Sequence, residues 1–293
     1  MSTDPSTPAG ERAVIVTGSS RGFGCLIAAR LAAEGWRVFA TMRNPESRHD
    51  LAAAVAAARA DQARVTTLPL DVLDPQSITA AVAGVLEETG GRLDAVVANA
   101  GIVALGAFED TPAETVRRVM DTNYFGVIET VRATLPSLRA SHGRVIVISS
   151  DSGLCGSPAL SAYAASKHAL EGWAESLAYE IGPLGVALSL IEPGVFRTGI
   201  WNAPTHRGGG GSPYGTFADV AESGWRQLGE GARAPDAVVR TVVRALGAKK
   251  PKLRYRVGAD ARRTGALKRA LPDALFAAYV RRTTGMHRWR PGR

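Results

Sequence analysis

The sequence predicts an α/β fold in which a single domain contains one doubly wound parallel sheet with helices on both faces. Apolar runs typical of buried parallel strands alternate along the chain with segments of helical periodicity. The first of these runs, residues 12–17, leads through a glycine-rich turn directly into a helix. Strand, glycine-rich turn and helix in this order form a cradle for phosphate, because a helix N-terminus offers free N–H groups.

The secondary structure follows from the apolar runs and from the helix start and stop signals. The expected strands cover residues 12–17, 37–43, 65–70, 93–98, 145–148, 186–191 and 253–257. The expected helices cover residues 25–34, 50–64, 74–89, 111–138, 162–177, 236–246, 265–271 and 272–282. Residues 199–231 are rich in glycine and are expected to form a flexible substrate loop, since a long loop in a compact α/β domain usually has a function.

The chain divides into a body and two ends. Residues 1–11 are rich in Ser, Thr and Pro and are expected to be a disordered tail, whereas residues 12–259 are expected to form the Rossmann-type domain. Two cysteines, Cys25 and Cys155, provide neither a disulfide framework nor metal-ligand spacing, so we expect a cytoplasmic protein without a metal site. No apolar run reaches the 18 or so residues that a membrane span needs.

Positive charge is concentrated at the C-terminus, where residues 260–293 are expected to form a basic helical extension. Residues 249–293 contain 14 Lys or Arg against 2 Asp or Glu, while the whole chain has a net charge of +8. A basic tail can bind nucleic acid or anionic lipid. We favour a solvated face that contacts the acidic body or a neighbouring subunit. No nucleic-acid partner is expected, and peripheral contact with lipid is the less favoured alternative.

The glycine-rich turn has the spacing TGxxxGxG, which differs from the GxGxxG of the usual dinucleotide fingerprint. Glycines in such a turn let the backbone approach a pyrophosphate closely. A tight connection between strand and helix, without a ligand, would need the same residues. The functional interpretation makes this turn a cofactor site formed by Gly18, Ser20, Arg21, Gly22, Phe23 and Gly24.

The end of the second strand indicates which dinucleotide is bound. In this kind of fold an acidic residue there binds the ribose hydroxyls of NAD, while arginine accommodates the 2′-phosphate of NADP. Here Thr41 occupies the place of the acid, and Arg43 follows two residues later. Arg43 and Arg21 could both pair with a phosphate dianion, so we expect NADP(H) in preference to NAD(H). The alternative is that Arg43 is an ordinary surface residue.

Tyr163 and Lys167 are four residues apart in a helical segment and therefore share one helix face. At about 5 Å and an effective dielectric of about 20, the ammonium would stabilise a phenolate by roughly 3 kcal/mol. That is worth about two pKa units, which would move the pKa of Tyr163 toward neutrality. The pair is thus a candidate proton donor and acceptor, although the same spacing occurs in ordinary amphipathic helices.

In combination these motifs resemble those of the short-chain dehydrogenase/reductase family, in its single-domain branch. The resemblance covers residues 12–259, and each motif lies at the end of an expected strand or on an expected helix. Each is weak alone, but together and in this order they are highly specific. The motifs are Thr17-Gly18-Ser19-Ser20-Arg21-Gly22-Phe23-Gly24, Asp71-Val72, Asn99-Ala100-Gly101, Asn123, Ser150, Tyr163-Ala164-Ala165-Ser166-Lys167 and Pro193-Gly194.

The resemblance implies a catalytic role for four residues. Tyr163 would give its proton to the carbonyl oxygen as hydride arrives from the nicotinamide. Lys167 would lower the pKa of Tyr163 and bind the nicotinamide ribose. Ser150, thirteen residues before Tyr163, would hold the substrate oxygen, with Ser149 and Ser152 as less favoured rivals. Asn123 would anchor a water that passes protons to Lys167.

The resemblance also implies cofactor contacts beyond the glycine-rich turn. Asp71, followed by Val72, would accept from the adenine amino group, and Asn99 would lie beside the adenosine ribose with Ala100 and Gly101. At the nicotinamide end, the implied contacts are Pro193, Gly194, Val195 and Thr198.

The substrate is expected to be a bulky apolar ketone or secondary alcohol. The segment from Leu253 to Ala261, with the basic helices after it, looks like the C-terminal extension of hydroxysteroid and retinol dehydrogenase-like members. Cys155, Phe196 and Trp201 are candidate substrate contacts. The alternatives are that Cys155 is a small apolar filler and that the aromatic residues only pack the loop onto the body.

Two other functions are compatible with the sequence. One is a non-catalytic NADP(H)-sensing regulatory protein, but such a protein would be expected to have lost the Ser, Tyr or Lys, and all three are present. The other is a module that docks through its basic tail. Because family members commonly assemble through the helices that here contain Asn123 and Tyr163, a homodimer or homotetramer is expected.

Overall fold

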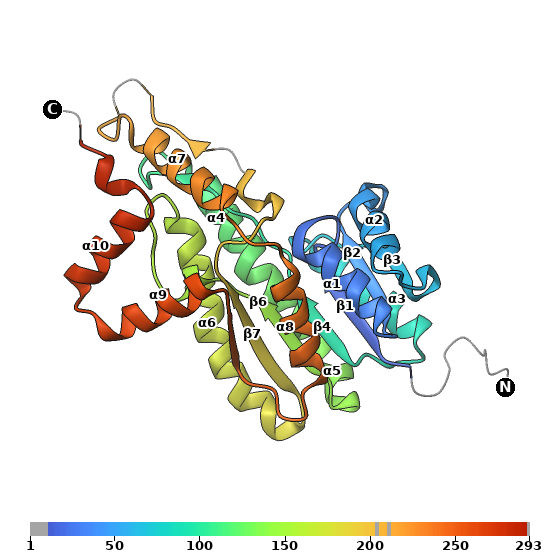
Figure 1. Ribbon diagram of the computed structural model, residues 1–293. Helices are drawn as coiled ribbons and strands as arrows, with labels where there is room; N and C mark the ends of the chain where they lie inside the picture. Colours follow the sequence, from blue (N-terminus) through green and yellow to red (C-terminus); the bar gives the residue numbers. More distant parts are fainter. Residues whose placement is uncertain (1–10, 203–204, 210–211, 292–293) are drawn as a thin grey trace, which may run out of the picture.

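The computed structural model describes residues 11–202, 205–209 and 212–291. Its central feature is a seven-stranded sheet with the order β3-β2-β1-β4-β6-β7-β9 (Figure 1). Every neighbouring pair is parallel, which confirms the doubly wound parallel sheet. The strands are β1 (Ala13–Thr17), β2 (Arg37–Met42), β3 (Val65–Pro69), β4 (Ala95–Ala98), β6 (Arg144–Ile148), β7 (Ala187–Pro193) and β9 (Arg254–Val257).

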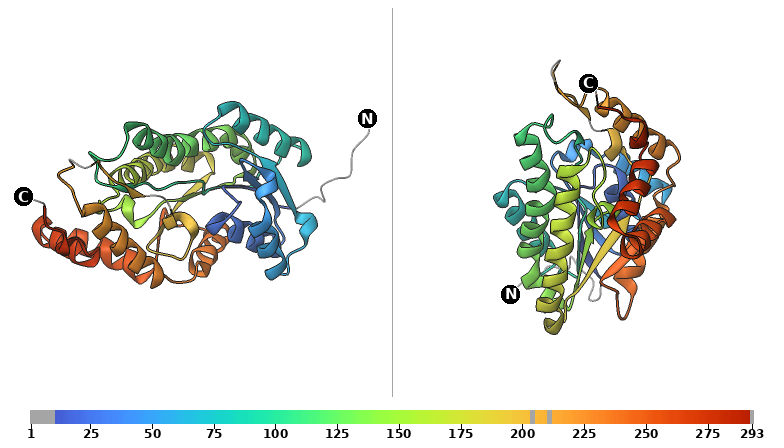
Figure 2. Two further views of the ribbon diagram at one scale, coloured as in Figure 1. Left: turned by 90° about the horizontal axis from the view of Figure 1, so that it is seen from above. Right: turned by 90° about the vertical axis from the view of Figure 1, so that its left-hand side faces the viewer.

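Helices cover both faces of the sheet, which lies between two helical layers in Figure 2. Alternate residues of β1 belong to different hydrophobic cores, because successive side chains of a strand point to opposite faces. Val14 and Val16 pack in one core with α1 (Gly22–Ala33), α2 (His49–Ala57) and α8 (Asp236–Gly247). Ala13 and Ile15 pack in the other with α3 (Pro75–Glu88), α5 (Gly126–Ser141) and α6 (Ser161–Ile181).

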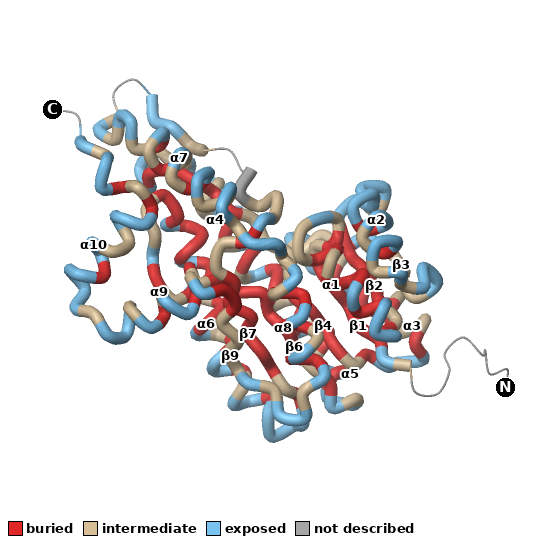
Figure 3. Tube along the Cα trace, in the orientation of Figure 1, coloured by how far each residue is buried: buried red, intermediate tan, exposed pale blue. Residues whose placement is uncertain are grey.

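The inner strands are buried along almost their whole length, and only the first residues of β2, β6 and β7 are partly exposed (Figure 3). Val14, Ile15 and Val16 of β1 are 0% exposed, and this burial on both faces explains the uninterrupted apolar runs in the sequence. The order of the strands reverses between β1 and β4. In open α/β sheets the ligand binds at such a switch point, outside the carboxyl ends of the strands.

Two helices differ from their expected extents. Residues 50–64 do not form one helix, because α2 ends at Ala57, Arg59 has a φ of 53°, and a separate 3-10 turn covers Gln62–Arg64. Residues 111–138 form α4 (Ala113–Met120), a π-helical turn (Asp121–Phe125) and α5. Apolar periodicity could not reveal this turn, since one wider turn barely changes which face is buried.

The prediction of a loop over residues 199–231 is wrong for the second half of this segment. Residues 199–202 form a 3-10 turn, η6 (Gly199–Asn202), and α7 spans Phe217–Glu230. Between them, β8 (Thr205–His206) pairs in parallel with β5 (Leu105–Gly106). The helical signal was present, since Ala218, Ala221 and Trp225 lie three and four residues apart and are buried, but two glycines obscured it.

The basic extension consists of α9 (Ala259–Ala270) and α10 (Asp273–Thr283), which follow β9. α9 begins six residues before the expected helix start at Gly265. Figure 1 shows α10 at the edge of the molecule, away from the sheet, and Figure 3 shows most of it exposed. Within the described residues, no helix is both long and apolar enough to cross a bilayer. Of the predicted N-terminal tail, residues 1–10 lie outside the described part.

Candidate active site

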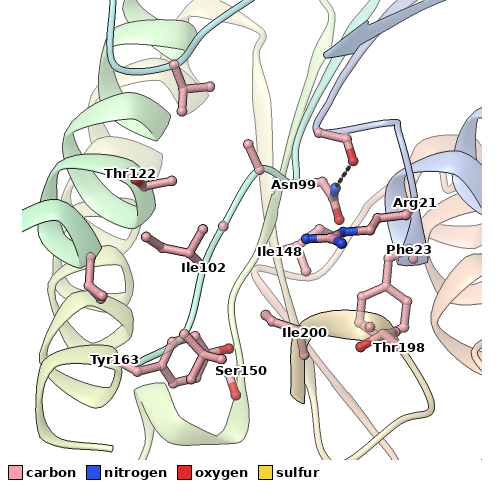
Figure 4. A pocket seen from close by; sticks show the side chains of 18 of the residues that line it. Arg21, Phe23, Asn99, Ile102, Thr122, Ile148, Ser150, Tyr163, Thr198 and Ile200 are labelled. Carbon is pink, nitrogen blue, oxygen red and sulfur yellow. Dashed lines mark hydrogen bonds between the residues drawn. The ribbon is translucent and has the colours of Figure 1, made fainter. Parts of the chain in front are cut away.

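A cavity of about 640 Å³ lies at the carboxyl ends of β1, β4, β6 and β7. Figure 4 shows Ser150 and Tyr163 side by side at one end, while Arg21, Phe23 and Thr198 lie together elsewhere on its wall. Most of the predicted site residues line this one cavity. They are Gly18, Ser20, Arg21, Gly22, Phe23, Arg43, Asp71, Val72, Asn99, Ala100, Gly101, Ser150, Tyr163, Lys167, Pro193, Gly194, Phe196 and Thr198.

The glycine-rich turn is held in place by its neighbours on β4. The Asn99 amide donates to the carbonyl oxygens of Thr17 at 2.9 Å and Gly18 at 3.2 Å. The Thr17 hydroxyl accepts from the backbone N–H groups of Asn99 and Ala100. The side-chain NH2 group of Asn99 is therefore occupied by its bonds to the turn, and only the other atoms of Asn99 can contact a ligand in the cavity.

The turn fits a dinucleotide cofactor. Gly24 does not line the cavity but lies beneath Gly18, where a Cβ on Gly24 would overlap the Gly18 carbonyl oxygen. The backbone of the turn thus faces the cavity with no side chain intervening at Gly18 or Gly22. Two guanidinium groups, of Arg21 and Arg43, lie in the same cavity wall. A volume of this size is typical of small-molecule and cofactor sites.

Thr41 is not available to a ribose. It is 0% exposed, and its hydroxyl faces the Val16 carbonyl oxygen at 3.3 Å. The cavity wall at the end of β2 is formed instead by Met42 and Arg43. Neither of these two lining residues carries a carboxylate that would repel a 2′-phosphate.

Ser150, Tyr163 and Lys167 come together from two elements. Ser150 follows β6, where its hydroxyl accepts from the Ser152 backbone N–H at 3.1 Å and caps a short 3-10 turn, η4 (Asp151–Gly153). Tyr163 and Lys167 lie one turn apart on α6 and are 5% and 4% exposed. The Lys167 ammonium donates to the Ile148 carbonyl oxygen at 2.9 Å and lies 5.7 Å from the Tyr163 ring centroid.

Burial dominates the acidity of this pair. Burial raises the pKa of Tyr163 to about 12, and the interaction with the Ser150 hydroxyl opposes this only in part. Burial lowers the pKa of Lys167 to about 8, while the Glu171 carboxylate acts in the opposite direction. The expectation that Lys167 brings the Tyr163 pKa toward neutrality is therefore wrong in this structure, because it neglected the cost of removing a phenolate from water. At neutral pH Tyr163 carries its proton.

Asn123 is 0% exposed and does not line the cavity. It lies in the π-helical turn, where its side chain accepts from the Ile102 backbone N–H at 2.8 Å and donates to the Ile102 carbonyl oxygen at 2.9 Å. It also donates to the Ser166 hydroxyl at 3.0 Å. These bonds fix the segment after Gly101, so the side chain of Asn123 supports the site from behind.

Replacement of Asn123 by alanine should destabilise the fold. Asn123→Ala leaves both polar groups of Ile102 without their partner, and each buried unsatisfied group costs about 1–3 kcal/mol. We expect the free energy of unfolding to fall by about 3 kcal/mol in urea titration, an estimate that follows from the same range. Asn44→Ala, which removes one exposed bond to Glu46, is the control. A loss no larger than that of the control would contradict the supporting role.

Comparison with known proteins agrees with this geometry. Residues 12–207 match the short chain dehydrogenase family. The chain belongs to this family. It is 36% identical to human 17-beta-hydroxysteroid dehydrogenase type 1 over 290 residues, which cover 94% of this chain and 84% of that protein. As a member of this family, the protein is an NAD(P)-dependent oxidoreductase.

Solved structures extend the similarity to the whole fold. A short-chain dehydrogenase from Streptomyces avermitilis superposes with a TM-score of 0.76 and 34% identity, covering 94% of this chain and 98% of that one. A metagenomic short-chain oxidoreductase in complex with NADP has a TM-score of 0.65 and 25% identity, covering 84% and 96% of the two chains. A nicotinamide cofactor is therefore supported for this short-chain dehydrogenase.

The predicted substrate residues of this short-chain dehydrogenase are not equally placed. Phe196 lines the cavity and packs edge-on against Phe23, with ring centroids 6.0 Å apart. Cys155 is buried but does not line the cavity, and its thiol faces the Asp151 carbonyl oxygen at 3.8 Å. The backbone of Trp201 belongs to η6, and its side chain lies outside the described part. Val195, predicted to touch the cofactor, does not line the cavity, although its neighbours Gly194 and Phe196 do.

Several lining residues were not anticipated from the sequence. Thr115, Arg118 and Thr122 reach the cavity from the helical segment before Asn123, and His206 reaches it from β8. The only sequence signal for the first three was their spacing of three and four, which places them on one helix face. Nothing in the sequence near His206 indicated that β8 pairs with β5.

Asp151 is a partly buried carboxyl beside the catalytic candidates. The Ser150 hydroxyl lies 3.1 Å from its carboxylate oxygen. Burial raises the pKa of Asp151 from 3.8 to about 6, the Ser150 hydroxyl lowers it, and the charge of Asp260 raises it further. Protonation therefore stabilises the folded state below about pH 4, and this stabilisation is lost as the pH rises through about 6.

Replacement of Asp151 by asparagine should stabilise the protein at neutral pH. A shift of about two pKa units corresponds to up to about 3 kcal/mol. We expect Asp151→Asn to have the higher free energy of unfolding at pH 7.5, with the difference from wild type vanishing near pH 4. Asp273→Asn, at a carboxylate whose side chain is 93% exposed, is the control. A pH-independent difference would show that burial of the charge is not the cause.

Proposed function

We propose that this protein is an NADP(H)-dependent oxidoreductase that transfers a hydride between the nicotinamide and a bulky, apolar ketone or secondary alcohol. One observation carries the proposal. Ser150, Tyr163 and Lys167 line the same cavity as the glycine-rich turn, Arg21 and Arg43. A proton donor and a dinucleotide site therefore share one space, as hydride transfer to a carbonyl requires.

The chain's own residues supply the proton and the orientation, while the bound nicotinamide supplies the hydride. Tyr163 holds its proton at neutral pH, as an ordinary tyrosine does, and burial raises its pKa further, to about 12. Its phenol can therefore donate to an oxygen placed between it and Ser150. The Ser150 hydroxyl, held by the Ser152 N–H, positions that oxygen. Lys167 is fixed by the Ile148 carbonyl and presents its ammonium behind the phenol.

The cofactor preference rests on charge. Arg21 and Arg43 provide two guanidinium groups in the cavity wall, and Thr41 is turned into the core. A guanidinium pairs with phosphate through two parallel bonds, so this wall favours the 2′-phosphate of NADP over the bare ribose of NAD. A structural relative was solved with NADP, which is consistent with this choice.

The preference for an apolar substrate rests on what surrounds Tyr163. Its ring packs in a buried cluster with Val103, Leu105, Leu160 and Trp225. Trp225 comes from α7, so this helix forms part of the apolar environment. Of this cluster Val103 lines the cavity, together with the apolar residues Ile102, Ile148 and Phe196, and displacement of water from these side chains favours apolar ligands. The similar human protein is named for a hydroxysteroid, a compound of this kind.

The proposal is tested by oxidation of NADPH in the presence of a panel of ketones. The panel should include steroid and aromatic ketones together with small polar ones. We expect turnover of the bulky apolar members and little turnover of the small polar ones. Absence of turnover with every ketone, in either direction, would overturn the proposal and favour a cofactor-sensing role.

We also propose a homodimer or homotetramer formed through α5 and α6. Tyr179 on α6 is 75% exposed, and Phe125, which immediately precedes α5, is 49% exposed. Large apolar side chains of this kind are suited to burial between subunits. Sedimentation velocity of the wild type and of Phe125→Glu should show dissociation in the variant alone.

A further inference from the structure

Asp260 connects the C-terminal extension to the nicotinamide end of the cavity. It lies in the first turn of α9, and its Oδ2 accepts from the Val195 backbone N–H at 2.7 Å. Val195 directly follows Pro193 and Gly194, which line the cavity where β7 ends. One carboxylate from the basic extension thus holds the turn that follows β7.

The chain leaves room for this carboxylate on two sides. A Cβ on Gly194 would overlap both carboxylate oxygens of Asp260. A Cβ on Gly258 would overlap Oδ1, and Gly258 also has a φ of +104°, which side chains rarely adopt. The two glycines and the carboxylate therefore form one interlocking unit, because none could change without displacing another.

One oxygen of the Asp260 carboxylate lies in an unfavourable environment. Oδ1 of Asp260 is buried without a hydrogen-bond partner in the described part of the chain, and the nearest cation, Arg233, is 3.8 Å away. Burying an oxygen that water would otherwise solvate is unfavourable. This carboxylate accepts a hydrogen bond from the Val195 N–H and, among the described residues, from no other group. It is a good means of fixing that one backbone group.

We propose that Asp260 is a positioning residue for the cofactor. By holding Val195 it fixes the turn of residues 193–195 in the conformation that receives the nicotinamide, and it makes the basic extension part of the cofactor site. This inference rests on the proposed function. The proposed adenosine half of the cavity, formed by Arg43, Asp71 and the glycine-rich turn, shares no hydrogen bond or ion pair with Asp260 among the described residues and should be independent of it.

This independence gives a test that separates positioning from general stability. The ligands are NADPH and 2′-phospho-ADP-ribose, which has the same adenosine half but lacks the nicotinamide. We expect Asp260→Ala to weaken the binding of NADPH about tenfold in calorimetry and to change the affinity for 2′-phospho-ADP-ribose by less than about twofold. A tenfold loss of affinity is in line with the loss of one charge-assisted hydrogen bond. Asp260→Asn keeps an oxygen for the Val195 N–H and should restore most of the NADPH affinity. Asp273→Ala removes the corresponding acid of the next helix and should change neither ligand.

Gly194→Ala approaches the same contact from the other side. Its Cβ displaces the carboxylate, so the affinity losses of Gly194→Ala and Asp260→Ala should not add in the double variant. Equal NADPH binding by Asp260→Ala and wild type would overturn the inference, and so would equal losses for both ligands. NADH and ADP-ribose form a parallel pair, which distinguishes a wrong cofactor preference from a wrong role for Asp260. A wild type that binds none of the nicotinamide cofactors would overturn the proposed function and the inference with it.

Discussion

Tyr163→Phe should reduce the rate of ketone reduction by about 10³-fold while leaving the affinity for NADPH within about twofold, since a positioned general acid contributes about 10²–10⁴. The substitution removes only the phenol oxygen, and the ring keeps its place among Leu160, Val103 and Trp225. NADPH fluorescence on binding gives the affinity, and NADPH oxidation with the best ketone of the panel gives the rate.

Tyr179→Phe provides the matched control for this experiment. Tyr179 belongs to the same helix, but its side chain is 75% exposed and does not line the cavity. The control should retain the wild-type rate and affinity. Full activity of Tyr163→Phe would show that another group donates the proton, and loss of NADPH binding would show that the variant disturbs the cavity rather than the chemistry.

Replacement of both Arg21 and Arg43 by alanine should lower the affinity for NADPH by about 100-fold or more, while the affinity for NADH should change by less than about threefold. Each hydrogen bond to a charged group contributes about 1.5–3 kcal/mol, and only NADPH has the 2′-phosphate that these groups would bind. The dissociation constants are measured by calorimetry at one fixed ionic strength, because salt screens exposed charges.

Arg48→Ala is the control for the loss of charge alone. Arg48 is exposed near the end of β2 and does not line the cavity. It should change both affinities slightly and equally, as a long-range effect of net charge. Equal losses of NADPH and NADH in the double arginine variant would refute the assignment of these residues to the 2′-phosphate.

The sheet and most of the cavity were predictable because their signals are local. A strand buried on both faces requires a continuous apolar run, and such runs located the inner strands to within two residues. The edge strands β3 and β9 were also located to within two residues, although they are only partly buried. The carboxyl ends of parallel strands meet at one edge. Residues directly after β4 and β6, such as Asn99 and Ser150, therefore line the same cavity.

What the sequence did not reveal depends on burial or on distant contacts. The high pKa of Tyr163 comes from desolvation, which a charge-pair argument cannot include. The committed amide of Asn99 and the buried bonds of Asn123 depend on backbone groups brought near only by folding. Helix α7 was obscured because its glycines outweighed its apolar spacing. Cys155 was close to the site in sequence, but its thiol faces the Asp151 carbonyl oxygen and does not line the cavity.

The bond between Val195 and Asp260 has a consequence for the order in which the protein becomes able to bind its cofactor. Its two residues are 65 positions apart, and the second lies close to the end of the chain. Ribosomes add about 5–20 residues each second, so roughly 3–13 s separate the synthesis of the turn from that of its anchor. The residues to which we assign the adenosine half of the cavity, such as Arg43 and Asp71, are synthesised well before Asp260. A nascent chain stalled before Asp260 should thus retain adenosine phosphates yet discriminate poorly between cofactors with and without a nicotinamide.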